Sequence, residues 1–283
     1  MGILDNKVAV ITGSSRGLGL GIAERYAAEG AAVIITSRSE KSVERAVNTL
    51  KQQGAKVAGI ACDVGDLDSV KKLRDFTLDT FGSLDIWVNN AGLSGPYGPT
   101  ADLSIESYEQ VLDTNIYGTY YGSVIAVRHF VAQGSGKLIN LLGRGDKGPV
   151  KYQNAYAPSK IWVRSFTLAL AQEYADSGVG IFAFNPGLVE TDMTQQVAAI
   201  QGYEAKLNPL RTIRRMWGNP PEVPAEKALW LASAATDGKT GIEVQVLDFP
   251  RVVRGALGEG LLRLTGKHNT VPLQIEVIPP AVP

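Results

Sequence analysis

A tyrosine and a lysine four positions apart, Tyr156 and Lys160, have the clearest chemical use in this sequence. They lie in a segment, 154–176, whose pattern predicts a helix, so the two side chains share one helix face. A lysine ammonium beside a phenol favours the phenolate and lowers the tyrosine pKa from its ordinary value of ~10. Proton transfer then becomes efficient near neutral pH. Alone, the pair is more often an ordinary pair on an amphipathic helix, and it predicts a proton-transfer site only together with the motifs described below.

A glycine-rich turn, TGSSRGLG at residues 12–19, could hold a phosphate. It follows the apolar run 7–11, which predicts a buried strand, and precedes a helical pattern. Glycine lets the backbone turn sharply and approach a pyrophosphate closely, while the free N–H groups and dipole of the following helix attract the anion. A tight turn without a ligand is the alternative, but the position after the first strand favours dinucleotide binding.

Short apolar runs alternate with helical patterns along most of the chain, and this alternation predicts a parallel sheet covered by helices. We therefore expect one α/β domain over residues 1–250, with a doubly wound, Rossmann-like sheet and three α/β/α layers. A long helix is predicted over 107–132 and a last strand over 242–247. Residues 251–283 contain several glycines and prolines and predict an extension that packs on this domain or on a neighbouring subunit. The predicted strands cover residues 7–11, 32–36, 56–61, 84–89, 136–141, 179–184 and 242–247.

Composition narrows the classes of partner. The 283 residues include 28 basic and 28 acidic side chains, and this zero net charge argues against nucleic acid or an anionic membrane as a partner. No apolar run approaches the ~18 residues that a membrane span needs. The single cysteine, Cys62, excludes an intrachain disulfide and favours a cytoplasmic setting. The two histidines are far apart in sequence, so no metal site is expected.

Three motifs occur in a specific order: the G-x-x-x-G-x-G turn, the stretch Asn89-Asn90-Ala91-Gly92 after the fourth predicted strand, and the Tyr156/Lys160 pair. With them the chain resembles the classical short-chain dehydrogenase/reductase family over roughly residues 5–248. The resemblance implies an NADP(H)-dependent oxidoreductase that interconverts a small-molecule carbonyl and an alcohol, and that assembles as a homotetramer or homodimer. The cofactor-binding positions carried over are Gly13, Ser15, Arg16, Gly17, Leu18, Gly19, Ser37, Arg38, Asp63, Val64, Asn89, Ala91, Gly92, Tyr156, Lys160, Pro186, Gly187, Val189 and Thr191.

The end of the second predicted strand favours NADP over NAD. Relatives that bind NAD place a carboxylate there, whereas this chain has Ser37 and Arg38. A guanidinium pairs well with a phosphate, so Arg38 is placed to meet the 2′-phosphate of NADP. Arg16, inside the glycine turn, is basic as in many NADP-preferring relatives. Solvated surface arginines are the alternative for both.

The resemblance also assigns catalytic roles. Tyr156 gives a proton to the carbonyl oxygen during reduction and takes it back during oxidation. Lys160 also holds the nicotinamide ribose, and Asn115 matches the asparagine that holds a water in the proton relay. The segment 193–221 corresponds to the one that closes over the substrate. Its basic run from Arg211 to Arg215 could meet an anionic substrate group, but a solvated face is the commoner use of such a run.

One member of the family's catalytic set is missing. The serine thirteen positions before the tyrosine, which orients the substrate carbonyl, is replaced by Gly143. Losing one oxyanion donor typically costs ~100- to 1000-fold in turnover. A neighbouring donor, Arg144 or Gln153, could replace it, or a substrate hydroxyl or water could fill the gap. Otherwise the chain is an NADP-binding protein with a regulatory or assembly role; a non-redox lyase or isomerase is also compatible with the Tyr156/Lys160 pair.

Overall fold

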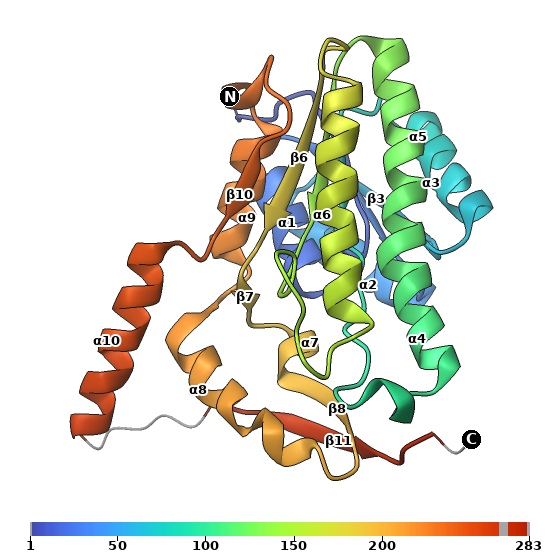
Figure 1. The fold of residues 1–283 in the computed structure, drawn as a ribbon. Coiled ribbons are helices and arrows are strands. Elements are labelled where there is room, and N and C mark those ends of the chain that lie inside the picture. The colour runs from blue at the N-terminus through green and yellow to red at the C-terminus, as the bar shows by residue number, and fades with distance from the viewer. Residues whose placement is uncertain (1, 266–270, 282–283) are drawn as a thin grey trace.

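The computed structural model describes residues 2–265 and 271–281 and is built around a seven-stranded parallel sheet (Figure 1). The strand order is β10-β6-β5-β4-β1-β2-β3. Every neighbouring pair in this sheet runs parallel, as the short apolar runs that alternate with helices predict. The strands are β1 (Val8–Ile11), β2 (Ala32–Ser37), β3 (Val57–Ala61), β4 (Ile86–Asn89), β5 (Gly136–Leu141), β6 (Val179–Asn185) and β10 (Glu243–Gln245).

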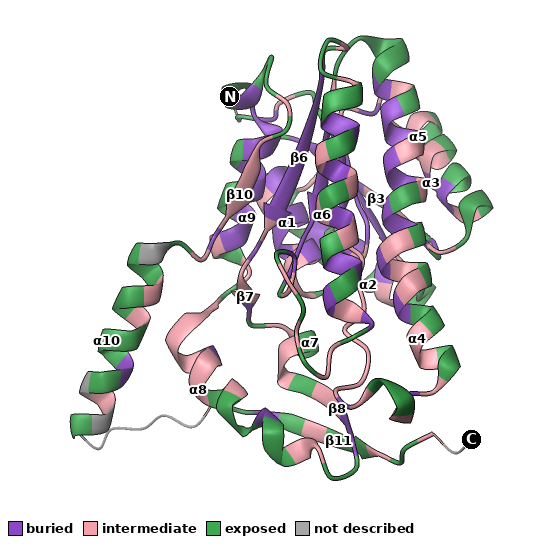
Figure 2. Cartoon of the chain, in the orientation of Figure 1, coloured by how far each residue is buried: buried purple, intermediate pink, exposed green. Residues whose placement is uncertain are grey.

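Helices cover both faces of the sheet, and each face has its own hydrophobic core (Figures 1 and 2). One core includes Ile22, Tyr26 and Leu229, and the other includes Leu73 and Phe130. The predicted doubly wound fold with three α/β/α layers is therefore confirmed. On the first face lie α1 (Gly17–Ala28), α2 (Glu40–Gln52) and α9 (Glu222–Ala232); on the second lie α3 (Leu67–Phe81), α4 (Ile105–Leu112), α5 (Gly118–Gln133) and α6 (Tyr156–Glu173).

The long helix predicted over 107–132 is interrupted by a π-helical turn. Ser104 caps the start of α4 by accepting from the Ser107 N–H at 3.1 Å, and Gly134 ends α5 in the left-handed conformation. Between the two helices, Asp113–Tyr117 forms the π-turn and carries the fully buried Asn115. A π-turn inserts a residue into the helical repeat and is common at functional sites. The hydrophobic pattern did not reveal it, because α4 and α5 run on almost without a break.

The segment between β6 and α9, residues 188–219, includes most of the stretch predicted to close over the substrate, and it is called the lid below. Its elements are β7 (Leu188–Val189), α7 (Asp192–Gln195), β8 (Gln196–Ile200), a 3₁₀ turn (Glu204–Leu207), α8 (Asn208–Trp217) and β9 (Gly218–Asn219). The isolated bridge between Tyr97 and Ala199 ties β8 to the loop after β4.

The C-terminal extension contains two elements that the sequence did not predict, α10 (Phe249–Thr265) and β11 (Gln274–Ile278). β11 pairs in parallel with β8 of the lid, from Gln274↔Gln196 to Ile278↔Ile200 (Figure 1). The sequence did not predict β11, because its partner strand lies far upstream and because apolar and polar residues alternate only weakly along it. Within the described part of the chain, no helix is both long and apolar enough to cross a bilayer.

The basic residues of α8 contact this extension, and for Arg214 and Arg215 these contacts replace the predicted solvated face, whereas Arg211 stays exposed. Arg214, only 2% exposed, donates to the Pro272 carbonyl, and Arg211 donates to the Leu273 carbonyl at 3.4 Å. Arg215 forms a two-pronged ion pair with Glu259 of α10, with N···O distances of 2.7 and 2.6 Å. Charged fork-to-fork pairs of this kind fix geometry as well as adding stability.

Candidate active site

The glycine turn has the backbone geometry of a phosphate cradle. Gly13 has a φ of +64°, which a side chain would strain, and a Cβ there would lie 2.9 Å from the Ala91 Cα. A Cβ on Gly19 would lie 2.5 Å from the Gly13 carbonyl oxygen. The turn therefore needs glycine at both positions, and α1 begins at Gly17 with its free N–H groups facing the same space. These observations fit a dinucleotide pyrophosphate.

The motif after β4 supports this turn from beside it. The Thr12 hydroxyl oxygen accepts from the N–H groups of Asn90 and Ala91, each at 3.0 Å, and Asn90 Nδ2 donates back to the Thr12 carbonyl at 2.8 Å. Asn89 points elsewhere: its Nδ2 donates to Asn140 Oδ1 at 2.8 Å in a buried polar network that crosses the sheet. Asn89 thus steadies the strands beneath the site, while Ala91 and Gly92 line it.

The predicted adenosine end lies at the carboxyl ends of β2 and β3. Ser37 at the end of β2 is paired with Ala61 at the end of β3. Arg38 and Asp63 therefore follow neighbouring strand ends. Arg38 is exposed, and Asp63 Oδ1 accepts from the Gly65 N–H at 3.0 Å. Arg16 is also exposed and forms an ion pair with Asp192 of α7 at 3.1 Å. Two guanidinium groups therefore stand at this rim with room to meet a phosphate. Ser15 and Leu18 lie partly exposed in the same turn, and Val64 is buried below it.

The three predicted catalytic residues meet at the start of α6. Tyr156 is the first residue of this helix, and Lys160 Nζ lies 5.6 Å from its ring centroid. The Lys160 ammonium donates to the Leu141 carbonyl at 3.0 Å. From the π-turn, Asn115 Nδ2 donates to Ser159 Oγ at 3.0 Å and to the Leu93 carbonyl at 2.9 Å. The π-turn thereby joins the loop after β4 to the first turn of α6.

Burial and a neighbouring carboxylate set the protonation of the pair. Burial raises the pKa of Tyr156 to about 12, and the negative charge of Asp146 adds to this rise. Burial also lowers the pKa of Lys160 to about 8, with Asp146 opposing it. The expectation that the lysine lowers the tyrosine pKa is therefore wrong for this geometry, because desolvation of the phenolate dominates.

The place of the missing serine is filled by the tyrosine itself. A Cβ on Gly143 would overlap the Tyr156 hydroxyl oxygen and lie 3.2 Å from its Cζ. A serine at position 143 would therefore require the Tyr156 ring to move. Of the two candidate replacement donors, Arg144 is exposed, whereas Gln153 has a buried Oε1 that accepts no hydrogen bond from the described residues.

The Pro-Gly turn after β6 closes the other side of the site. Asn185 Oδ1 accepts from the Gly187 N–H at 2.9 Å, and Pro186 lies between them. Thr191 caps α7, and its Cγ2 would be 3.2 Å from a Cβ on Gly17. The turn predicted to hold the nicotinamide therefore lies against the glycine turn, and Val189 is buried behind it.

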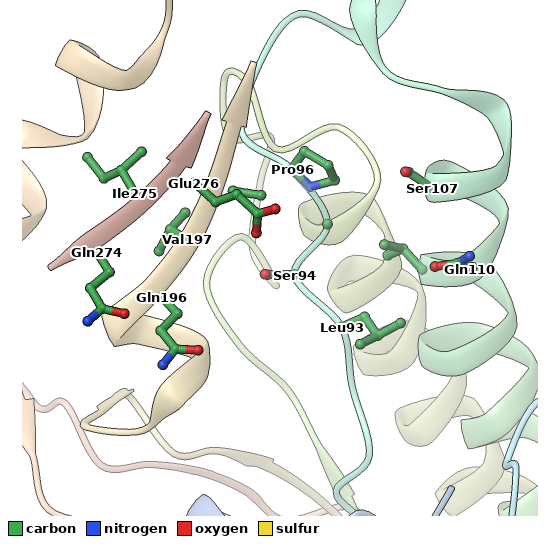
Figure 3. Close-up of a pocket in the computed structure, with 13 residues that line it drawn as sticks. Leu93, Ser94, Pro96, Ser107, Gln110, Gln196, Val197, Gln274, Ile275 and Glu276 are labelled. Atoms are coloured by element: carbon green, nitrogen blue, oxygen red, sulfur yellow. The ribbon is translucent and has the colours of Figure 1, made fainter. Parts of the chain in front are cut away.

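A pocket of about 650 Å³ adjoins the site between the loop after β4, α4 and the lid (Figure 3). Gln196 and Gln274 lie side by side in it from the paired strands β8 and β11, so the C-terminal extension forms part of its wall. Leu93 connects it to the catalytic group through its backbone bonds to Asn115. The lining residues are Leu93, Ser94, Gly95, Pro96, Ser107, Gln110, Val111, Gln196, Val197, Ala198, Gln274, Ile275 and Glu276.

Replacing the buried lysine is expected to stabilise the fold at neutral pH. A lysine pKa lowered to about 8 in the folded state corresponds to a destabilisation of about 3 kcal/mol at pH 7, because the buried ammonium has lost its water. The folded state binds fewer protons than the unfolded state between the two pKa values, so stability rises with pH through that range. Lys160→Met should therefore raise the free energy of unfolding by about 2 kcal/mol at pH 7, after the loss of the hydrogen bond to Leu141.

Urea denaturation at pH 7 and pH 10 measures this effect. The gain in Lys160→Met should shrink at the higher pH, where the wild-type lysine is neutral in the folded protein. Lys41→Met, at an exposed position in α2, is the control and should show neither gain nor pH dependence. A variant less stable than wild type at pH 7 would show that interactions within the protein fully compensate the Lys160 ammonium for its lost hydration.

Comparisons with known proteins match this chain to dehydrogenases. The model of a family described as short chain dehydrogenase matches residues 7–201. The chain is 31% identical to glucose 1-dehydrogenase 2 of Bacillus subtilis over 84% of its length and 92% of that protein. It is 36% identical to 3beta-hydroxysteroid dehydrogenase 1 of Eggerthella lenta, over 84% and 91% of the two chains.

Solved structures agree. A 3-ketoacyl-(acyl-carrier-protein) reductase from Brucella melitensis, complexed with NADH, aligns with a TM-score of 0.77 at 28% identity, covering 88% of this chain and 99% of that one. A gluconate 5-dehydrogenase from Burkholderia cenocepacia, in complex with NADP and tartrate, aligns with a TM-score of 0.73 at 26% identity, covering 86% and 95%. Relatives of this fold thus include chains bound to either nicotinamide dinucleotide.

Proposed function

This chain belongs to the short-chain dehydrogenase family, and from that membership we propose that it is an NADP(H)-dependent oxidoreductase that interconverts a carbonyl compound and an alcohol. The observation that carries the proposal is the convergence of Tyr156, Lys160 and Asn115 at the start of α6, beside a glycine turn shaped for a pyrophosphate. A protein that only bound the cofactor would have no chemical need for this set.

A bound nicotinamide dinucleotide supplies or accepts the hydride at the carbonyl carbon. The protein supplies the proton: Tyr156, which is protonated at neutral pH, donates the proton of its hydroxyl to the carbonyl oxygen. The ammonium of Lys160 stabilises the phenolate that forms, and a pKa of about 8 lets Lys160 return a proton to it near neutral pH. Asn115 holds the first turn of α6 in place through Ser159. In oxidation the proton moves the other way.

The function is tested by following NADPH and NADH consumption against a panel of ketones, aldehydes and keto sugars. We expect NADPH oxidation with at least one class and recovery of the matching alcohol. Tight NADPH binding with no oxidation across the panel would overturn the proposal in favour of a regulatory or assembly role. Conversion of substrate without net NADPH consumption would indicate a lyase or isomerase.

Arg38 is expected to set the cofactor preference. Its guanidinium is exposed just after β2, the position that the family resemblance assigns to the 2′-phosphate of NADP, and a charge-assisted hydrogen bond contributes about 1.5–3 kcal/mol. Arg38→Ala should therefore lower kcat/KM for NADPH about 10- to 100-fold and leave the value for NADH nearly unchanged. Arg45→Ala, an exposed arginine of α2, is the matched control. A wild-type protein that prefers NADH would contradict the assignment of NADP.

We also propose that the chain forms a homodimer or homotetramer through an aromatic face formed by the end of the π-turn, α5 and α6. Tyr117, Tyr120 and Ile161 are 50%, 43% and 37% exposed. Trp162 and Phe166 stack at 4.7 Å, and Phe166 lies edge-on to Tyr120. Large exposed apolar patches usually mark an interface. The same face on a second copy of the chain is equally apolar and could pack against this one.

Ile161→Glu is expected to weaken that assembly, because a carboxylate at the centre of an apolar interface must lose its water. Sedimentation velocity at micromolar concentrations should show a shift to smaller species with an unchanged circular dichroism spectrum. Leu67→Glu, at an exposed apolar position in α3, is the control. An unchanged sedimentation coefficient in Ile161→Glu would place the interface elsewhere.

A further inference from the structure

The pocket beside the catalytic residues has one wall that comes from the C-terminal extension. A Cβ on Gly92 would lie 3.8 Å from Lys160 Nζ, and the next two residues, Leu93 and Ser94, line the pocket. The pocket therefore begins next to the catalytic lysine. Across it lie β8 and β11 (Figure 3), and β11 is beyond residues 7–201, which the family model matches.

The strand β11 is fixed in place and is not a loose tail. It pairs with β8 over five residues, and Leu273, which precedes it, is only 8% exposed. Arg214 and Arg211 of α8 donate to the Pro272 and Leu273 carbonyls. Side chains on a strand held in this way are positioned more precisely than side chains on a loop.

The neutral side chains around the pocket are suited to hydroxyl groups. Gln274 of β11 is in register with Gln196 of β8, and Figure 3 shows the two amides side by side. The facing wall adds the polar side chains of Ser94, Ser107 and Gln110. Amides and hydroxyls both donate and accept hydrogen bonds, as a substrate hydroxyl does. The three glutamines are exposed, so their amide groups are open to a ligand.

The charge of the pocket disfavours an anion. Among the described residues that line it, Glu276 of β11 has the one ionisable side chain. Its neighbour in register is the small Ala198, and its carboxylate points towards the loop that carries Ser94 (Figure 3). A substrate carboxylate or phosphate in this space would meet a like charge, whereas a substrate hydroxyl could donate to Glu276.

We propose that Gln196, Gln274 and Glu276 bind a part of the substrate away from the reacting carbon and select a neutral polyhydroxyl group over an anionic one. The substrates are then uncharged polyols and the corresponding carbonyl compounds. A pocket of about 650 Å³ has the size of a small-molecule site and holds several carbons beyond the reacting one. The proposal rests on the proposed function of the same site, and it makes the C-terminal extension a determinant of specificity.

The first test compares two six-carbon alcohols that differ at one end, D-sorbitol with a CH₂OH group and D-gluconate with a carboxylate, in oxidation by NADP⁺. The wild-type kcat/KM should be at least about 10-fold higher for sorbitol, because gluconate must desolvate its charge beside a like charge. In Glu276→Gln this ratio should fall about fivefold, the effect of one like charge at about 4 Å in water. Glu173→Gln, at an exposed glutamate at the far end of α6, should keep the wild-type ratio.

Gln274→Leu tests the amide wall. It should lower kcat/KM for sorbitol about fivefold, because one neutral hydrogen bond is lost, and leave the value for cyclohexanol nearly unchanged. Cyclohexanol has no further hydroxyl for the pocket to bind, so it is the control substrate. The pairing of β11 with β8 uses backbone groups and should persist in the variant. An equal loss for both alcohols would overturn the role of the amide.

A binding measurement separates this inference from the proposed function. The dissociation constants of sorbitol and gluconate are measured by NMR titration of Tyr156→Phe saturated with NADP⁺, in which binding is seen without turnover. A preference for sorbitol that Glu276→Gln reduces supports the inference even if no alcohol is oxidised. Equal binding of the two compounds, no binding of sorbitol, or an unchanged ratio in Glu276→Gln overturns it, while the carbonyl panel still decides the oxidoreductase assignment.

Glucamine, in which an ammonium replaces one end hydroxyl of sorbitol, tests the neutral class in the same titration. It should bind within about fivefold of sorbitol, because an exposed ion pair contributes little in water. Binding more than about 10-fold tighter than that of sorbitol would overturn the neutral class in favour of cationic substrates.

Discussion

Tyr156→Phe is expected to lower kcat/KM for carbonyl reduction about 1000-fold while changing the Kd for NADPH less than threefold. The substitution removes one hydroxyl and keeps the ring against which Gly143 and Lys160 lie. General acid catalysis by a positioned side chain contributes about 10²–10⁴-fold, and near Tyr156 the other ionisable groups are the Lys160 ammonium and the Asp146 carboxylate. Lys160 donates to the Leu141 carbonyl and is not directed at the substrate oxygen.

Steady-state kinetics and fluorescence titration with NADPH measure the two quantities. Tyr174→Phe makes the same chemical change just beyond the other end of α6 and should keep wild-type kinetics. A Tyr156→Phe variant that retains more than a tenth of the wild-type turnover would mean that another group or a bound water donates the proton. That result would remove the central residue from the proposed mechanism.

Gly143→Ser is expected to reduce turnover about 100-fold, although it restores the residue type that the family uses. The Cβ alone overlaps the Tyr156 hydroxyl, so the ring must move before any serine hydroxyl can act. A displacement of about 1 Å from the productive geometry can cost about 100-fold in rate. Because Tyr156 Oη is the free end of a side chain, the ring can yield at a small cost in folding stability, and the loss should appear in activity.

Gly143→Ala separates the steric effect from the hydroxyl. It carries the same Cβ without the oxygen and should lose about as much activity as Gly143→Ser, with both variants melting within a few degrees of the wild type. Gly148→Ser is the control in the same loop, because a Cβ there meets no atom within 4 Å. A gain of activity in Gly143→Ser would show that the oxyanion position is vacant in the native protein and that Tyr156 tolerates the displacement.

Much of the fold was predictable because its determinants are local. Each central strand is a short apolar run, and parallel strands buried on both faces need little else to be recognised. The glycine turn was predictable for the same reason. Position 13 has a positive φ and position 19 approaches the backbone of the turn closely, and both conditions require glycine. Helical spacing predicted that Tyr156 and Lys160 share one helix face, and the two other motifs then marked the pair as a site.

The C-terminal extension was only partly predictable. Its position beyond the last central strand was apparent, but the pairing of β11 with β8 joins segments far apart in the chain. Such a pairing depends on backbone N–H and C=O groups, which almost every residue has. No particular residue type therefore predicts it. The same holds for Arg214. In the sequence it is one of several basic residues, and only the fold shows that it is buried and donates to the Pro272 carbonyl.

The sequence by itself determined that Tyr156, Lys160 and a phosphate-binding turn share one edge of a parallel sheet, because the alternation of strands with helices and the helical periodicity depend on neighbouring residues. Only the tertiary structure decided how those groups behave. Burial, which depends on the whole surrounding fold, reversed the expected direction of the Tyr156 pKa. The packing of α6 against the end of β5 placed the Tyr156 hydroxyl in the space of the missing serine. The meeting of two turns then joined Asp146, which no motif had marked, to Asn185 through a hydrogen bond.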